Sequence, residues 1–245
     1  MKVTKLHGLF KLCQVTSDID KVNFIHQSSD NTVILEFIES KARITGVIES
    51  KYGPSIKLEG KICIPQVSEI LQILNNCGEN TTLENNFGPI LKIEDSDTSL
   101  KASCYIDQES QCAKIFRPKA ALIDGDRIDM VMDSKKIQSI LATTKSMSGC
   151  SKININTSIE TSELHFKISQ TEESESFGEI KIPVIINHTI NSNYNVNLDL
   201  DIIQKVFDLN KKSNIVDISI YSNILLKLKF TYANDTISTY LLPVI

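Results

Sequence analysis

The sequence predicts an α+β protein of two similar domains, each built from a duplicated unit of one strand, one helix and three further strands. Two observations predict this arrangement. A short helical pattern occurs four times, at intervals of 64, 67 and 66 residues. Each occurrence is followed by about three runs in which apolar and polar residues alternate, as in strands with one buried and one wet face. One short helix cannot bury its apolar face alone, so two units are expected to pair into one domain.

The four helical patterns each place large apolar residues at relative positions 0, 3 and 4, which fall on one helical face. The four sets are Leu6, Leu9 and Phe10; Ile70, Ile73 and Leu74; Ile137, Ile140 and Leu141; and Ile203, Val206 and Phe207. Three such residues recur by chance in many sequences, but the nearly equal spacing and the matching strands favour a true repeat. Helix-starting residues support the later three patterns: Pro65 before the second, Asp133 or Ser134 before the third, and Asp199 before the fourth.

Strands are expected around all four helices. The expected strands after the helices are 21–26, 32–38 and 42–48; 81–84, 90–94 and 99–106; 152–157, 163–168 and 176–182; and 216–221, 225–232 and 236–242. Strands 55–64, 126–132 and 194–198 precede the later three helices. Between the two pairs of units, segment 108–124 has weak periodicity and is interpreted as a connector. The predicted domains are therefore 1–107 and 125–245.

Composition indicates a globular protein of 245 residues with 41% hydrophobic residues and a net charge of -4. No run of eighteen apolar residues occurs, so no membrane span and no membrane partner are predicted. The amphipathic N-terminus has no small-residue cleavage site after it and is interpreted as mature structure. The six cysteines stand singly, so free thiols in a reducing compartment are expected. These features predict a cytoplasmic protein, or a nuclear one in a eukaryote, and not a secreted one.

Motifs of enzymes and metal sites are not found in the sequence. It contains no phosphate-binding glycine loop, no nucleophile elbow, no zinc-protease motif and no paired-cysteine motif. The four histidines are far apart along the chain, and the acidic pairs stand in expected turns. We therefore predict no catalytic residues, no metal site and no cofactor.

The order of elements resembles the DNA sliding clamp family over essentially the whole chain. That family includes proliferating cell nuclear antigen and the T-even phage processivity clamp. The segment Lys114-Ile115-Phe116-Arg117-Pro118 and residues 128–146 resemble the phage clamp, which favours a phage or viral origin. Residues 238–243 resemble the final strand of cellular and archaeal clamps.

The resemblance implies a non-enzymatic DNA polymerase processivity factor. Three two-domain chains would form a homotrimeric ring around double-stranded DNA, with the helices lining the hole and the sheets outside. The implied partners are DNA without sequence preference, a DNA polymerase, a clamp loader and further copies of the chain.

Lysines on the helices are the expected DNA-facing residues, because phosphate contacts need cations and carry no sequence information. Opposite the apolar stripes stand Lys11, Lys135, Lys205 and Lys212, and on the flanks stand Lys5, Lys136, Lys145 and Lys211. Exposed helices commonly carry lysine, so the set favours DNA contact more than any one member does. The second helix departs from the pattern, since its outer face presents Ser68, Gln72 and Asn75 with Glu69 nearby.

Partner peptides in this family bind beneath the connector. The matching positions here are Leu122, Ile123, Tyr240, Leu242 and Pro243, for which plain core packing is an equal alternative. Other functions also stay open at this point: a non-ring DNA-replication accessory or binding module, a clamp paralogue in a hetero-ring, or an α+β enzyme whose residues converge only in space.

Overall fold

The computed structural model divides into two compact units. Unit 1 comprises Met1–Lys41, Thr45–Phe116 and Asn234–Ser238, and unit 2 comprises Ala42–Ile44, Arg117–Ala233 and Thr239–Ile245. The described residues are 5–16, 19, 21–39, 41, 43–51, 56–58, 60–85, 88–107, 112, 127–146, 149–169, 178–188, 193–221 and 224–245. The predicted connector 108–124 lies outside them except for Cys112, so the domain limits 1–107 and 125–245 stay predictions.

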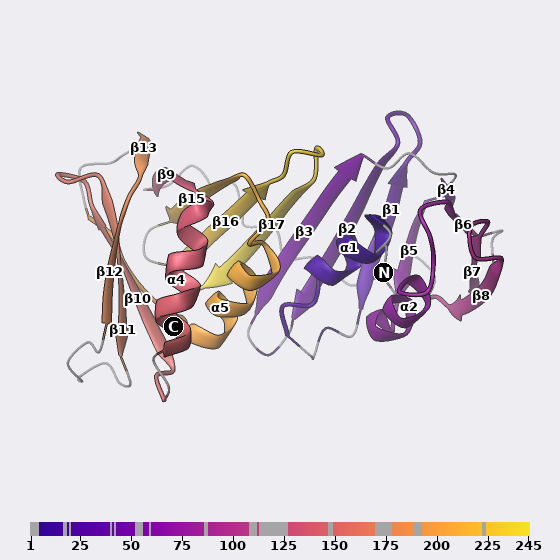
Figure 1. The fold of residues 1–245 in the computed structure, drawn as a ribbon, viewed down its shortest axis with the longest axis horizontal. Coiled ribbons are helices and arrows are strands. Elements are labelled where there is room, and N and C mark those ends of the chain that lie inside the picture. The colour runs from indigo at the N-terminus through magenta and orange to yellow at the C-terminus, as the bar shows by residue number, and fades with distance from the viewer. Residues whose placement is uncertain are drawn as a thin grey trace. The chain divides into compact units, whose positions relative to one another are not determined.

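Helices occur where all four repeats were expected (Figure 1). They are α1 (Lys5–Leu12) and α2 (Val67–Leu74) in unit 1, and α4 (Lys135–Ser146) and α5 (Leu200–Leu209) in unit 2. In α1, α4 and α5 all three residues of the predicted apolar stripe are buried. Within each unit the two helices pack side by side.

Helix α2 differs from the prediction in its buried face. It buries Val67, Ile70, Leu71 and Leu74, whereas Ile73 is half-buried. The spacing 67, 70, 71 and 74 gives a more continuous stripe than one through Ile73, because these positions follow the helical period over two full turns. The helix begins just after Pro65, as predicted, and Gln66 is its N-cap.

The caps of the unit 2 helices use the predicted acidic residues. At α5 the carboxylate of Asp199 accepts a hydrogen bond from the backbone N–H of Ile202 at 3.1 Å. At α4 the carboxylate of Asp133 accepts from the N–H of Lys135 at 2.9 Å, and the carbonyl of Ser134 accepts from Ile137. Both satisfy donors that the first turn of a helix leaves without a partner.

Unit 1 contains two groups of paired strands. One runs in the order β3 (Ile44–Lys51), β2 (Thr32–Glu39), β1 (Val22–Gln27) and β5 (Lys61–Ile64). The other runs β4 (Ile56–Lys57), β6 (Thr81–Glu84), β7 (Ile90–Asp95) and β8 (Leu100–Tyr105). The expected single strand 55–64 is two short strands, β4 and β5. Gly60 separates them at a φ of 78°, a left-handed conformation that glycine adopts without steric cost.

Unit 2 repeats this plan. One group runs β13 (Ile185–His188), β9 (Arg127–Asp133), β15 (Ile215–Tyr221), β16 (Leu225–Thr231) and β17 (Ile237–Pro243). The second runs β12 (Gly178–Pro183), β11 (Glu163–Ser169), β10 (Lys152–Ser158) and β14 (Asn195–Asp199). Strand β13 was not predicted, and its exposed Ile185 shows why: the strand has no buried apolar alternation to reveal it.

The repeats interlock through their leading strands. Strand β5 precedes α2 but pairs with β1, the first strand after α1. Likewise β14 precedes α5 but pairs with β10, and β9 precedes α4 but pairs with β15. Each of these strands therefore completes the sheet of the other repeat in its unit.

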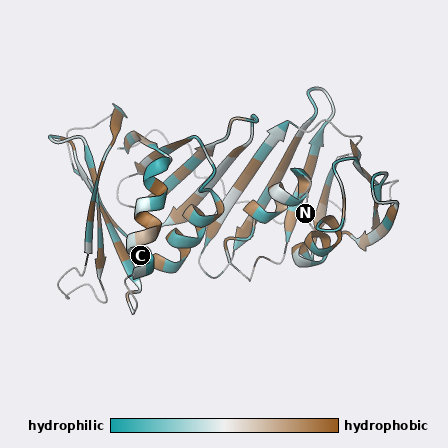
Figure 2. Ribbon diagram, in the orientation of Figure 1, coloured by the Kyte–Doolittle hydropathy of each residue, from teal (hydrophilic) through white to brown (hydrophobic). Residues whose placement is uncertain are grey.

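The core lies between the helices and the apolar faces of the strands. Strands β10, β11 and β16 alternate buried with half-buried residues, as the sequence predicted, and Figure 2 shows the same alternation as brown and teal bands. In unit 2, Phe230 lies edge-to-face with both Phe207 and Tyr240, at centroid distances of 6.0 and 5.9 Å. In unit 1, Phe10 of α1 stacks on Phe24 of β1 at 6.0 Å. Such pairs fix how helix and sheet fit together.

The six cysteines are free, as predicted. Cys13, Cys63, Cys77 and Cys104 are buried, and burial raises the pKa of the Cys104 thiol to about 11. Among the described residues no helix is long and apolar enough to cross a membrane.

Candidate nucleic-acid interface

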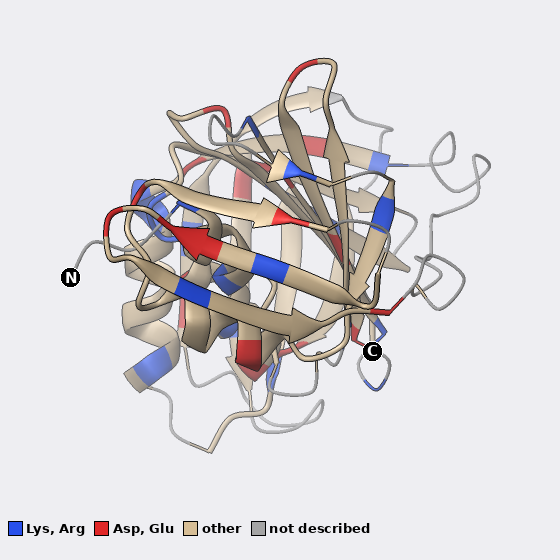
Figure 3. Cartoon of the chain, turned by 90° about the vertical axis from the view of Figure 1, so that its right-hand side faces the viewer, with Lys and Arg blue, Asp and Glu red and all other residues tan. Residues whose placement is uncertain are grey.

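The helices of unit 2 carry a cluster of lysines that we call the α4–α5 basic surface. Its members are all exposed: Lys135, Lys136, Lys145, Lys205, Lys211 and Lys212. Their positions follow from the buried stripes, because Ile137 and Ile140 turn one side of α4 to the core and leave the other to solvent. Figure 3 shows the basic and acidic residues on the ribbon. The exposure that DNA contact requires is therefore present at all six positions.

The lysines of α1 in unit 1 behave differently from one another. Lys11 is exposed in the last turn of the helix. Lys5 is half-buried, and its ammonium group donates a hydrogen bond to the carbonyl of Lys51 on β3. Burial lowers the pKa of Lys5, against the opposing influence of the Asp235 carboxylate. Lys5 thus ties α1 to β3, whereas Lys11 extends into solvent.

The outer face of α2 is not basic. Ser68, Gln72 and Asn75 are exposed there, as the sequence predicted, and Glu69 is exposed beside them. A phosphate approaching this helix would meet uncharged polar groups and one carboxylate. The cationic surface of the helices is therefore concentrated on unit 2 and on Lys11.

Asp208 of α5 was not among the predicted site residues, but it lies beside two lysines of the α4–α5 basic surface. Its carboxylate lies 3.2 Å from the ammonium of Lys211 and 3.7 Å from that of Lys145 in the last turn of α4. Burial acts to raise the pKa of Asp208, but the hydrogen bond and charge of Lys211, together with Lys145, hold the pKa below its ordinary value. The Lys211 contact has the i,i+3 spacing that a sequence can reveal. The Lys145 contact depends on how α4 packs against α5.

The predicted peptide-pocket residues in the final strand are mostly packed in unit 2. Tyr240 is fully buried, and Leu242 is 2% exposed. Pro243 is half-buried. Leu122 and Ile123 lie outside the described residues, so the pocket stays a prediction.

A buried asparagine joins α5 to β17 and to the segment that follows β16. Asn210, the C-cap of α5, donates from its amide to the carbonyl of Val206 at 2.8 Å and to the hydroxyl of Tyr240 at 3.1 Å. Its amide oxygen accepts from the hydroxyl of Tyr232 at 2.7 Å. Asn210 is fully buried, so this network fixes the end of α5 against β17 and against Tyr232, the residue that follows β16.

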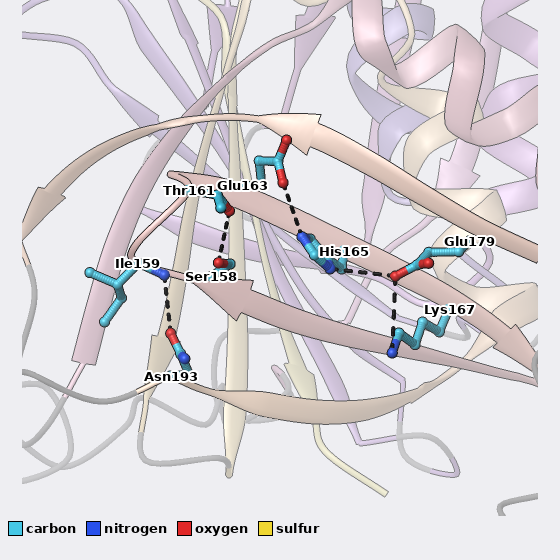
Figure 4. A network of polar contacts seen from close by, with 8 residues as sticks. All are labelled: Ser158, Ile159, Thr161, Glu163, His165, Lys167, Glu179 and Asn193. Atoms are coloured by element: carbon cyan, nitrogen blue, oxygen red, sulfur yellow. Dashed lines mark hydrogen bonds and ion pairs between the residues drawn. The ribbon is translucent and has the colours of Figure 1, made fainter.

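The wet face of β11 and β12 carries a second polar network (Figure 4). His165 of β11 lies 3.2 Å from Glu163 and 3.4 Å from Glu179 of β12. Lys167 lies 4.0 Å from the same Glu179. Within the described part of the chain no group of three or more histidine, cysteine or acidic side chains is arranged to hold a metal ion. The network joins the outer strand β12 to its neighbour.

The chain matches known proteins in its structure and not in its sequence. No family model and no curated protein sequence matches the chain. Among solved structures, the crystal structure of the PCNA2–PCNA3 complex from Sulfolobus tokodaii matches with a TM-score of 0.73 and 14% sequence identity, covering 98% of this chain and 95% of that chain. The chain has the sliding clamp fold. At this identity the likeness extends to the fold alone, and it confirms the predicted α+β class.

The clamp fold covers nearly the whole chain, so the two units and their four described helices all belong to it. Two features of this clamp fold stand out in the described residues. The outer face of α2 lacks cations, and two lysines of the α4–α5 basic surface are paired with Asp208.

Proposed function

We propose that this protein is a DNA polymerase processivity factor, a sliding clamp whose ring encircles duplex DNA and tethers a polymerase to it. The observation that carries the proposal is the clamp fold over 98% of the chain. The exposed lysines of α4, α5 and the end of α1 support it, because a ring lined by helices needs cations on their outer faces.

Sliding requires weak contacts, and the charges of the chain suit it. Lysine contacts to phosphates carry no sequence information and are screened by salt. The net charge of -4 keeps the whole molecule from wrapping DNA tightly, while the α4–α5 basic surface supplies a local positive field. Retention then comes from the closed ring and not from affinity.

Ring closure needs one free sheet edge from each unit, and the described strands offer two. Strands β8 and β12 are six residues each and stand at the ends of their sheets. The other edges are short or already used: β4 has two residues and β13 has four, β5 bridges to Asp107, and Asn197 of β14 accepts a hydrogen bond from the N–H of Ile245. We infer that β8 of one copy pairs with β12 of the next, since unpaired edges recruit strands of other chains.

An exposed apolar pair on β7 and β8 supports the choice of this edge. Tyr105 is 74% exposed and stands opposite Ile90, which is 42% exposed. Large apolar side chains side by side at a strand edge are typical of an interface.

The assembly has a direct test. Three copies of the 27.4 kDa chain should give a particle of about 82 kDa in light scattering. The substitution Tyr105→Asp should dissociate it. Ile224→Asp changes another exposed hydrophobic side chain, 57% exposed and outside both strands, and should leave the particle intact. A particle that is unaffected by Tyr105→Asp would contradict the β8 interface.

Retention on DNA tests the function itself. The clamp, loaded by a clamp loader, should stay on nicked circular DNA and leave when the circle is cut, and it should lengthen the products of its polymerase. A chain that stays monomeric and is not retained would refute the homotrimeric clamp. Recovery of a ring upon adding a second, different clamp chain would then favour a hetero-ring subunit, which the likeness to a PCNA2–PCNA3 complex also supports.

The polymerase contact is proposed from the resemblance at the connector and the final strand. We infer a peptide pocket formed by Leu122, Ile123, Tyr240, Leu242 and Pro243. Replacing Leu122 and Ile123 by Glu should abolish stimulation of the polymerase while the ring stays on circular DNA. Unchanged stimulation would refute the pocket.

A further inference from the structure

We propose that Asp208 competes with DNA phosphates for Lys145 and Lys211, and so lowers the affinity of the clamp for DNA. The inference rests on the proposed function and concerns the same helical surface. It assigns to one acidic side chain the role of keeping contacts to the duplex short-lived.

The three groups meet where the last turns of α4 and α5 lie together. The side chains are 61% exposed at Lys145, 44% at Lys211 and 38% at Asp208, so solvent and a ligand can reach all three. The two ammonium groups lie 3.7 and 3.2 Å from the carboxylate. Both lysines also stand near helix C-termini, whose carbonyl groups attract cations independently of Asp208.

The charge arithmetic favours competition over simple support of the fold. One carboxylate between two ammonium groups leaves the trio with half the positive charge that its lysines carry. Exposed ion pairs of this kind contribute little to stability, so a phosphate can displace the carboxylate. The displaced carboxylate stays tethered beside the lysines and returns when the phosphate moves away.

The remaining lysines of the α4–α5 basic surface differ in this respect. Within the described residues, ion pairs are formed by Lys145 and Lys211 and not by Lys135, Lys136, Lys205 or Lys212. Asp208 therefore acts on one end of the surface. Phosphates must displace the Asp208 carboxylate to bind Lys145 and Lys211, but they meet no such competitor from the described part of the chain at the other four lysines.

The chain offers a matched control on the same helix. Asp201 is exposed in the first turn of α5, and seven residues, or two helical turns, separate it from Asp208. The two carboxylates thus share one face, and Asp201→Asn removes the same charge as Asp208→Asn. A difference in DNA affinity between these two variants therefore reports the release of Lys145 and Lys211 and not a general change in the electrostatic field.

The experiment measures binding of the full-length protein to a short fluorescent duplex by anisotropy, across a fourfold range of salt. Asp208→Asn should bind more tightly than wild type. Its plot of log affinity against log salt should steepen by about 0.9 for each new phosphate contact, which is about a threefold greater loss of affinity over that range. Asp201→Asn should show a smaller gain in affinity and an unchanged slope, and Asp208→Glu should resemble wild type.

Two further measurements complete the test. Adding Lys145→Ala and Lys211→Ala to Asp208→Asn should cancel the gain, and single-molecule tracking should show slower diffusion of Asp208→Asn along DNA. If Asp208→Asn and Asp201→Asn have the same affinity and slope, the inference is overturned. Retention of wild type on nicked circles, measured in parallel, reports the proposed function separately: its loss refutes the clamp while a distinct Asp208→Asn slope still supports the competition.

Discussion

The substitution Asn210→Ala should destabilise unit 2 strongly. Asn210 is fully buried and its side chain makes hydrogen bonds with the Val206 carbonyl and with the hydroxyls of Tyr240 and Tyr232. Alanine removes all three bonds and leaves space beside the C-terminus of α5. The carbonyl and the two hydroxyls that lose the amide lie around a fully buried position, so water cannot readily take its place.

The expected cost follows from the three bonds. Each contributes about 1 kcal/mol net, so the free energy of unfolding should fall by about 3 kcal/mol. In a chain of this length that corresponds to a fall in Tm of about 6–12 °C. Tyr240→Phe removes one of the three bonds and keeps the ring against Phe230, so it should cost about 1 kcal/mol.

Urea denaturation followed by far-ultraviolet circular dichroism measures both variants, since the chain has no tryptophan to report unfolding by fluorescence. The two midpoints should shift in the ratio of about three to one, with unchanged slopes. A loss below about 1 kcal/mol for Asn210→Ala would show that the network does not stabilise α5 against the strands, and would refute the reasoning.

Further predictions concern packing, capping and thiol exposure. Gly46→Ala should lower the free energy of unfolding by about 3 kcal/mol in urea denaturation, because the new Cβ would lie 2.1 Å from the ring of the buried Phe37. Gly8→Ala in α1, where nothing lies within 4 Å of the new Cβ, should raise it by about 0.5–1 kcal/mol. Equal effects of the two substitutions would contradict both predictions. Asp199→Ala should cost about 1 kcal/mol by removing the N-cap of α5, and no loss would mean that the cap is dispensable. A thiol reagent should label the native protein at the half-buried Cys112 and Cys150. It should not label the buried cysteines, which are Cys13, Cys63, Cys77 and Cys104. Labelling of these four before unfolding would contradict their burial.

Much of the fold was predictable because its signal is local. The 0, 3, 4 spacing located all four helices, since residues that near in sequence share one helical face. Asp199 was recognisable as a cap for the same reason. Helix α2 shows the limit of this reasoning: Leu71 and Ile73 are equally apolar, and only the packing of the unit buries the first and leaves the second half-buried.

The candidate site was predictable as a set of lysines and not as a set of interactions. Lys11 and the lysines of unit 2 are exposed, as helical geometry required. Helix geometry could not reveal that Lys5 bonds to Lys51, or that Lys145 lies beside Asp208, because these contacts join segments far apart in the chain. Strand β13 was missed because its exposed Ile185 breaks the alternation by which strands are recognised.

The crossing of leading strands between repeats has a consequence for how the molecule reaches its native state. A fragment that ends after β12 would hold α4 yet lack β14 at one border of its sheet, and its own β9 would have no β15 to join. Neither half of unit 2 can therefore be native before the other has been synthesised. Paired residues lie 39–47 positions apart in β10 and β14 and 82–94 positions apart in β9 and β15. Such distant segments must meet first, so folding should be slow and all-or-none, and two halves expressed as separate polypeptides should become structured only when mixed.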